Sequence, residues 1–259
     1  MIIIVSKMRW RRIGVVLAAF LAVVAWLIFN PRSYEEIFIK VENNGAEGEI
    51  SNTDFSVACT AETIKNETCY DKTDKNLAIN VLGVLEVKGR APKTGYSREE
   101  FYNSWPTVDG CSLRQRIIKR EFGETAVLDG CTVVAGEFEE PYTGEWKVFN
   151  SKEEISKGIQ IDHVVALSDA WQKGAQYLDK TVRYEMATDP LNLLAVNASA
   201  NQGKSDGDAA TWLPKNKKFR CQYVARQVSV KHKYGLWVTE AEKEAIYNIL
   251  LTCPNERVL

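Results

Sequence analysis

The sequence predicts an α+β domain preceded by one apolar N-terminal helix. Three observations lead to this fold class. The 259 residues are 45% apolar and 26% charged, a composition typical of a folded domain and not of a disordered chain, a collagen or a polytopic membrane protein. One uncharged segment, residues 13–29, lies near the N-terminus. Beyond it, short β-branched segments alternate with segments of helical periodicity.

The uncharged segment predicts a membrane anchor. Residues 13–29 follow four cations within residues 1–12, the pattern of a transmembrane helix or of the apolar part of a signal peptide. No small-x-small cleavage site follows, and Trp26 and Phe29 suit the interfacial end of a span, so we favour an uncleaved anchor over secretion. Residues 1–12 are then a cytoplasmic tail, and the rest of the chain lies outside the plasma membrane.

The remaining chain divides by composition into two parts. Residues 30–80 are polar and interrupted by asparagine and glycine, which favours a stalk or an N-terminal extension. Residues 81–259 are the predicted compact domain. Residues 33–259 contain 28 basic and 34 acidic residues, so a polyanionic partner must bind a local basic surface.

All six cysteines follow the apolar segment, on the side predicted to be oxidising. An even number of cysteines there predicts disulfides. A zinc site is the alternative, but the chain has no C-x-x-C pair and only two histidines. Short sequence spacings favour the pairs Cys59–Cys69 and Cys111–Cys131. The remaining two cysteines would then form the pair Cys221–Cys253.

Local patterns predict the elements of the compact domain. Helical spacing favours two helices between residues 97 and 122, separated near Pro106. The segments 132–138 and 145–149 flank a turn and predict a hairpin. Further along the chain we expect a strand at 159–167, a helix capped by Ser168 and ending at Gly174, a strand at 191–196, a helix at 198–204 and an amphipathic helix at 240–251.

Polar residues near the expected strands at 159–167 and 191–196 have the side chains that phosphodiester hydrolysis requires. That reaction needs a base to activate water, a divalent cation to neutralise charge, and a fixed geometry. His163, with an ordinary pKa of about 6.5, can accept a proton from water at pH 7. Asp162 and Asn201 offer the hard oxygen donors that Mg²⁺ prefers. Lys204 follows Asn201 by one helical turn and can contact the same phosphate.

Adjacent strand residues point to opposite faces of a sheet. Asp162 and His163 can therefore share a site only if the strand ends, twists or bulges there. Each residue also has a structural interpretation: His163 as a packed histidine, and Asn192 and Asn201 as turn or cap residues. Their combination favours the functional interpretation.

These residues carry a resemblance to a known family. The segment IDHVV at Asp162 and His163, then Asn192, then NQGKSD at Asn201 resembles the HNH (ββα-metal, His-Me finger) endonucleases, including the nine-residue step between the two asparagines. More narrowly, GEFEEPYTG, IQIDHVVALSDAWQKGA and DPLNLLAVNASANQGKSD are similar to an extracellular bacterial HNH family, the domain of unknown function 1524. The likeness runs from about Thr94 to Cys253.

The resemblance implies a fold and a set of roles. The fold would be a ββα-metal core with flanking helices and a small antiparallel sheet. His163 would be the general base, Asp162 and Asn201 would hold one Mg²⁺ or Mn²⁺ ion, and Asn192 would brace the loop that carries the base. The sequence departs from the pattern in two places: Asn201 stands where many HNH proteins have a histidine, and the segment between His163 and Asn192 is longer than in the minimal motif.

Basic residues near this motif predict a nucleic-acid surface. Positions 201–238 contain eight basic and two acidic residues, and no base-reading motif accompanies them. The expected phosphate contacts are Lys204, Lys215, Lys217 and Arg220. A solvated lysine-rich face is the structural alternative.

We therefore expect a nuclease domain at residues 81–259 that hydrolyses DNA, with RNA as a further substrate, and has low sequence specificity. It would act outside a bacterial plasma membrane, anchored to it or secreted. The alternative is a catalytically inactive, membrane-anchored module that binds nucleic acid or the cell envelope. Protein partners are not predicted.

Overall fold

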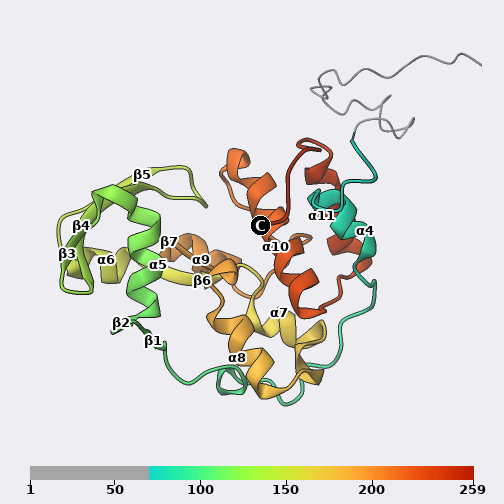
Figure 1. Cartoon of the computed structure of the whole chain (residues 1–259), viewed down its shortest axis with the longest axis horizontal. Helices are drawn as coiled ribbons and strands as arrows, with labels where there is room; N and C mark the ends of the chain where they lie inside the picture. Colours follow the sequence, from blue (N-terminus) through green and yellow to red (C-terminus); the bar gives the residue numbers. More distant parts are fainter. Residues whose placement is uncertain (1–69) are drawn as a thin grey trace, which may run out of the picture. The chain divides into compact units, whose positions relative to one another are not determined.

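The computed structural model describes residues 70–259, and these form an α+β fold with small antiparallel sheets, as predicted (Figure 1). The predicted tail, the anchor at 13–29, most of the 30–80 extension and the cysteines Cys59 and Cys69 lie outside the described residues. Within residues 70–259, no helix is both long and apolar enough to cross a membrane.

The central element is an antiparallel pair of strands, β6 (Ile159–His163) and β7 (Leu193–Asn197), followed directly by α9 (Ala198–Lys204). Alternate residues of β7 point to opposite faces. Leu193 and Ala195 pack in one hydrophobic cluster, whereas Leu194 and Val196 pack in another. Because both faces of β7 are buried, its sequence is continuously apolar.

One face of this pair is covered by a small sheet and a helix. The sheet contains β3 (Val127–Asp129), β4 (Thr132–Glu139) and β5 (Trp146–Phe149) in that order. The helix α5 (Leu113–Phe122) lies alongside β4 and contacts β7 (Figure 1), and α6 (Lys152–Gly158) leads into β6. The predicted hairpin between residues 132 and 149 is confirmed.

Helices α4 (Ala78–Val84), α10 (Arg220–Tyr234) and α11 (Glu240–Leu250) pack with Leu194 and Val196 on the other face. Helices α7 (Leu167–Gln172) and α8 (Lys180–Thr188) form a separate hydrophobic cluster with the C-terminal part of α10. The predicted helices at 198–204 and 240–251 are confirmed, the latter one residue shorter. Short elements connect them: η2 (Arg98–Glu100), β1 (Thr107–Val108), β2 (Cys111–Ser112), η3 (Gly123–Thr125), η4 (Ala175–Tyr177), η5 (Pro190–Asn192) and η6 (Lys217–Phe219).

Three local predictions are wrong. The first of two helices expected between residues 97 and 122 is only the single turn η2, because the chain then enters the hairpin β1–β2, whose turn places Asp109 and Gly110 at positive φ. Ser168 does not cap α7; its hydroxyl donates instead to Asp206. The strand expected at 159–167 ends at His163, because the next two backbone amides bond to Asn192 rather than to a ladder partner.

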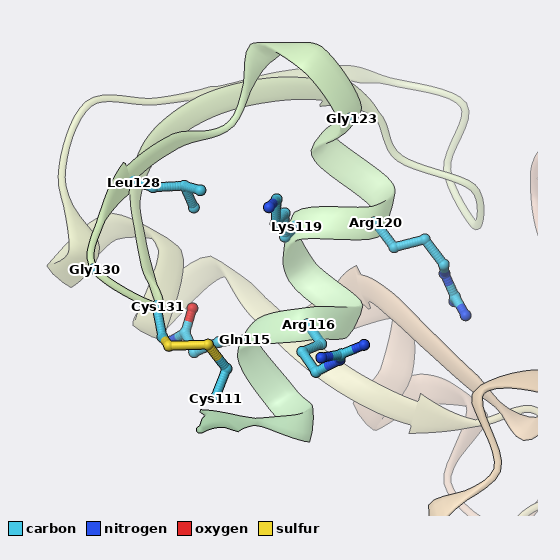
Figure 2. Close-up of a pocket in the computed structure, with 9 residues that line it drawn as sticks. All are labelled: Cys111, Gln115, Arg116, Lys119, Arg120, Gly123, Leu128, Gly130 and Cys131. Atoms are coloured by element: carbon cyan, nitrogen blue, oxygen red, sulfur yellow. A yellow bond between two sulfur atoms is a disulfide. The ribbon is translucent and has the colours of Figure 1, made fainter. Parts of the chain in front are cut away.

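Two disulfides tie loops to this framework. Cys111–Cys131 joins β2 to the turn before β4, at the wall of a pocket of about 440 Å³ beside α5 (Figure 2). Cys221–Cys253 joins α10 to the segment after α11. Both pairs agree with the predicted pairing.

A buried ionic cluster holds α7, α10 and α11 together. Lys173, directly after α7, lies 2.7 Å from Asp208 and 2.6 Å from Glu242, and its side chain is fully buried. Asp169, Lys231 and Arg90 complete the cluster, which contains three cations and three carboxylates. The charges balance, and the short distances place an opposite charge next to each ion of the cluster.

Candidate active site

A polar pocket of about 360 Å³ lies between β6 and the C-terminal half of α9. Its walls come from β6, α7, α9, the loop after α9 and the segment that leads into η2. Among the residues that line it are Asp162, His163, Asn201, Gln160, Asp206 and Arg98. The structure thus brings together three of the residues singled out from the sequence, which are distant along the chain.

His163 is held in one tautomer. Its Nε2 lies 2.9 Å from the carbonyl oxygen of Ala187, and this oxygen can only accept a hydrogen bond. Nε2 therefore carries the proton, and Nδ1 has a free lone pair. Trp105 stacks on the ring with a centroid distance of 5.9 Å, and Tyr102 packs at 5.8 Å, so the ring is fixed in orientation.

Burial keeps this imidazole neutral. Only 6% of His163 is exposed, and the loss of hydration lowers its pKa to about 3, although the bond to Ala187 opposes the change. The sequence suggested an ordinary value, because the aromatic residues that bury the ring precede it by about 60 positions. The ring is therefore in the neutral form that a general base requires, whereas a pKa of about 3 makes it a weak proton acceptor.

Asp162 lies on the opposite face of β6 and is also buried. One carboxylate oxygen, Oδ1, accepts a hydrogen bond from Lys204 Nζ at 2.9 Å, and Oδ2 accepts one from the Tyr142 hydroxyl. Burial raises the pKa of Asp162, and the charge of Lys204 opposes this rise. Asp162 and His163 reach one pocket because β6 ends at His163, one of the irregularities that their adjacency required.

Lys204 lies beneath the pocket and not on its surface. Its side chain is fully buried, and Nζ donates to Asp162 and, at 2.8 Å, to the carbonyl of His163. In this arrangement the lysine, expected from the sequence to contact a substrate phosphate, joins both residues of the Asp-His pair to α9.

Asn192 connects the end of β6 to the start of β7, at one end of the strand pair. Its backbone carbonyl accepts from Val164 N at 2.9 Å, and its side-chain oxygen accepts from Val165 N at the same distance. The side-chain nitrogen faces the carbonyls of Val165 and Met186. Asn192 is completely buried, so it braces the backbone that immediately follows His163.

The donor types at this pocket suit a hard divalent cation, but both oxygens of Asp162 already accept hydrogen bonds, from Lys204 and Tyr142. Asn201 donates its amide nitrogen to Gln160 at 2.9 Å, which leaves the amide oxygen as an acceptor. Together with the carboxylate of Asp162 this gives two oxygen donors at one pocket, and Mg²⁺ commonly takes one or two protein ligands with water and phosphate oxygens. No group of three or more His, Cys, Asp or Glu side chains within residues 70–259 is placed to hold a metal ion.

The other predicted phosphate contacts do not line this pocket. Lys215 and Lys217 are exposed around η6, and Arg220 donates to the carbonyl of Pro214. The basic stretch at 201–238 is divided, because Lys231 belongs to the buried ionic cluster and Lys233 pairs with Asp189 at 2.6 Å.

Sequence reasoning missed several residues of the pocket. Gln160 lies two positions before Asp162, and the period of a strand places the two on one face. Tyr142, which bonds Asp162, belongs to the hairpin turn and had no functional signal of its own. Lys93, Tyr96 and Arg98 reach the pocket from a segment more than 60 residues before β6, which no local pattern predicts.

Comparison with known protein families supports the nuclease resemblance at a coarser level. Residues 113–249 match the family described as GmrSD restriction endonucleases, C-terminal domain, over more than half of the chain. The chain belongs to this family. The GmrSD C-terminal domain of this protein includes β6, β7 and α9, whereas the pocket residues Lys93, Tyr96 and Arg98 precede the match.

The chain is also similar to a fungal protein. The GmrSD-family chain is 34% identical over 180 residues to an uncharacterized secreted protein of Arthroderma benhamiae. The aligned residues cover 68% of this chain and 84% of that protein. No solved structure matches.

Proposed function

We propose that this protein is a metal-dependent endonuclease of the HNH type, which hydrolyses DNA, with RNA as a further substrate. The observation that carries the proposal is the His163 ring, neutral, fixed by Ala187 and placed at a polar pocket with Asp162 and Asn201. Family membership supports nuclease chemistry. The chain order of two antiparallel strands followed by a helix, β6, β7 and α9, supports the proposal of a ββα-metal core.

The residues of the chain divide the reaction between them. Nδ1 of His163 takes a proton from a water molecule, whose oxygen attacks phosphorus as the bond to the 3′ oxygen breaks. The leaving oxygen takes a proton from solvent, and the other product keeps a 5′-phosphate. Asp162 and Asn201 would hold Mg²⁺ or Mn²⁺, and the bound ion would offset the charge that develops on the phosphate.

Asn192 and Lys204 position these groups. Asn192 fixes the backbone that follows the base. Lys204 holds the carboxylate of Asp162 and the carbonyl of His163 from one side, so that the two residues keep their relative position. The absence of a base-reading motif in the sequence supports low sequence specificity.

The protein would act outside the cell, secreted or anchored through residues 13–29. Two disulfides favour an oxidising compartment, and the relative from Arthroderma benhamiae is described as secreted.

Plasmid nicking tests the proposal. The purified full chain is incubated with supercoiled DNA, single-stranded DNA and RNA, with Mg²⁺, Mn²⁺ or EDTA. We expect cleavage that EDTA abolishes and Mg²⁺ or Mn²⁺ restores, and a loss of at least about 100-fold in His163→Ala. Cleavage that resists the chelator would contradict the metal assignment, and full turnover in His163→Ala would contradict the base.

One observation favours a second function, a binding module without turnover. Lys204 already neutralises Asp162, so the carboxylate has a cationic partner without any metal ion. Retention of DNA without cuts in every divalent ion would support this alternative.

A further inference from the structure

A segment outside the family match completes the pocket. Residues 93–105 precede the match at 113–249, yet Lys93, Tyr96 and Arg98 line the pocket. Tyr102 and Trp105 from the same segment pack against the His163 ring. The segment therefore supplies both a wall of the pocket and the support of the proposed base.

Arg98 differs from the other cation on this wall. Lys93 pairs with Asp206 at 3.3 Å, which offsets its charge. Within residues 70–259, Arg98 forms no salt bridge. Its guanidinium lies over the Tyr102 ring, 5.0 Å from the centroid, and Nε donates to the Tyr102 hydroxyl at 3.1 Å. The Nη2 group faces the same hydroxyl, and Nη1 donates to no group in this part of the chain.

This geometry suits an anionic ligand. Tyr102 fixes one edge of the guanidinium and leaves donors on the other, so the fork is oriented before a ligand arrives. The pocket also contains the carboxylates of Asp162 and Asp206, which would repel an anion without a compensating cation. A phosphodiester oxygen matches the charge and the donor arrangement of Arg98.

We propose that Arg98 binds a non-bridging oxygen of the phosphodiester attacked in this pocket, and that the segment 93–105 is thereby part of the substrate site. This inference rests on the proposed nuclease function. It adds a substrate contact from outside the family match. Arg98 bonds to Tyr102, and Tyr102 packs against the proposed base His163.

The test compares Arg98→Gln and Arg98→Lys with a matched control, Arg116→Gln. Arg116 is an exposed arginine of α5 that pairs with Asp109 and lines the separate pocket of Figure 2. For each full-length variant, kcat/KM is measured on plasmid DNA, and DNA affinity is measured in the His163→Ala background with a labelled duplex oligonucleotide across a salt series.

We expect Arg98→Gln to lower both kcat/KM and affinity by about 10- to 100-fold, the range for a lost hydrogen bond to a charged group. The slope of log Kd against log salt should fall by about one, since one phosphate contact is lost. A purely structural role would not change this slope. Arg98→Lys should recover part of the affinity and the full slope, and Arg116→Gln should stay within about twofold of wild type.

The outcomes separate the two proposals. If wild type cleaves DNA and Arg98→Gln keeps the wild-type kcat/KM and salt slope, the role of Arg98 is overturned and the nuclease proposal stands. Wild type that binds DNA without cutting overturns the nuclease proposal, and the salt slope of Arg98→Gln still decides whether Arg98 contacts phosphate. If Arg98→Gln does not fold, as judged by circular dichroism, the salt series is repeated with Arg98→Met: a slope lowered by about one supports the phosphate contact, and a wild-type slope overturns it.

Discussion

The ammonium of Lys204 lies 2.9 Å from Oδ1 of Asp162, and neither side chain is appreciably exposed. A carboxylate buried in this way is stable as an anion only if an opposite charge remains next to it. Since Lys204 also donates to the His163 carbonyl, the same ammonium holds the carboxylate of Asp162 and the backbone of His163. Stability and activity are therefore coupled at this lysine.

Replacement of Lys204 by methionine should destabilise the fold strongly. Removal of one partner of a buried ion pair typically costs about 3–5 kcal/mol, because the remaining charge is uncompensated. The free energy of unfolding from urea denaturation measures the loss. Lys157→Met, at an exposed position of α6, should change it by less than about 0.5 kcal/mol. Equal stability of the two variants would show that Asp162 does not depend on the pair.

Asn192 should act on catalysis without contact to the substrate. Asn192→Ala removes the acceptor for Val165 N, and a shift of the adjacent His163 should lower kcat by about 100-fold. DNA affinity should stay near wild type, which a general loss of structure would not allow. Asn192→Asp keeps the acceptor oxygen and should recover part of kcat. Asn150→Ala, at an exposed position, is the control, and an equal decrease there would contradict the positioning role.

Much of the framework could be predicted from local sequence. The apolar segments of β6 and β7 and the helix at 198–204 were detectable because each is a property of a few adjacent residues. The nearness of Asp162 and Asn201 followed from the motif. Contacts across long separations were not detectable: Lys204 looked like a surface lysine, since nothing near it in sequence shows that Asp162, 42 residues away, covers it.

The pocket wall illustrates the same limit. The spacing at 97–122 predicted two helices, and the second exists as α5. Where the first was expected, Tyr102 and Trp105 pack against His163 and do not form a helix face. Tertiary packing therefore produced a pattern that local rules interpret as secondary structure. The basic stretch was misleading for a related reason, since Lys231 is used inside the ionic cluster.

The protonation state of His163 should not change between pH 8 and pH 5. Its pKa is lowered to about 3, so the neutral ring persists until the pH approaches that value. Nitrogen-15 chemical shifts of labelled histidine should show a protonated Nε2 and an unprotonated Nδ1 across this range, with His232→Gln used for assignment because the chain has two histidines. Titration of His163 near pH 6.5 would contradict the burial of the ring.

Asp208 should make stability depend on acid pH. Burial would raise the pKa of its carboxyl, but the hydrogen bond and charge of Lys173, together with Arg90, lower it to about 2. Because the folded-state pKa lies below that of the unfolded chain, near 3.8, the contribution is fully present above about pH 4 and is lost as the pH falls toward 2. The melting temperature of wild type should decrease in this window. Asp208→Asn should have a lower melting temperature at pH 7 and a smaller decrease in melting temperature between pH 4 and pH 2. The control Asp129→Asn, at an exposed position of β3, should follow wild type. A parallel decrease in all three proteins would exclude Asp208 as the responsible group.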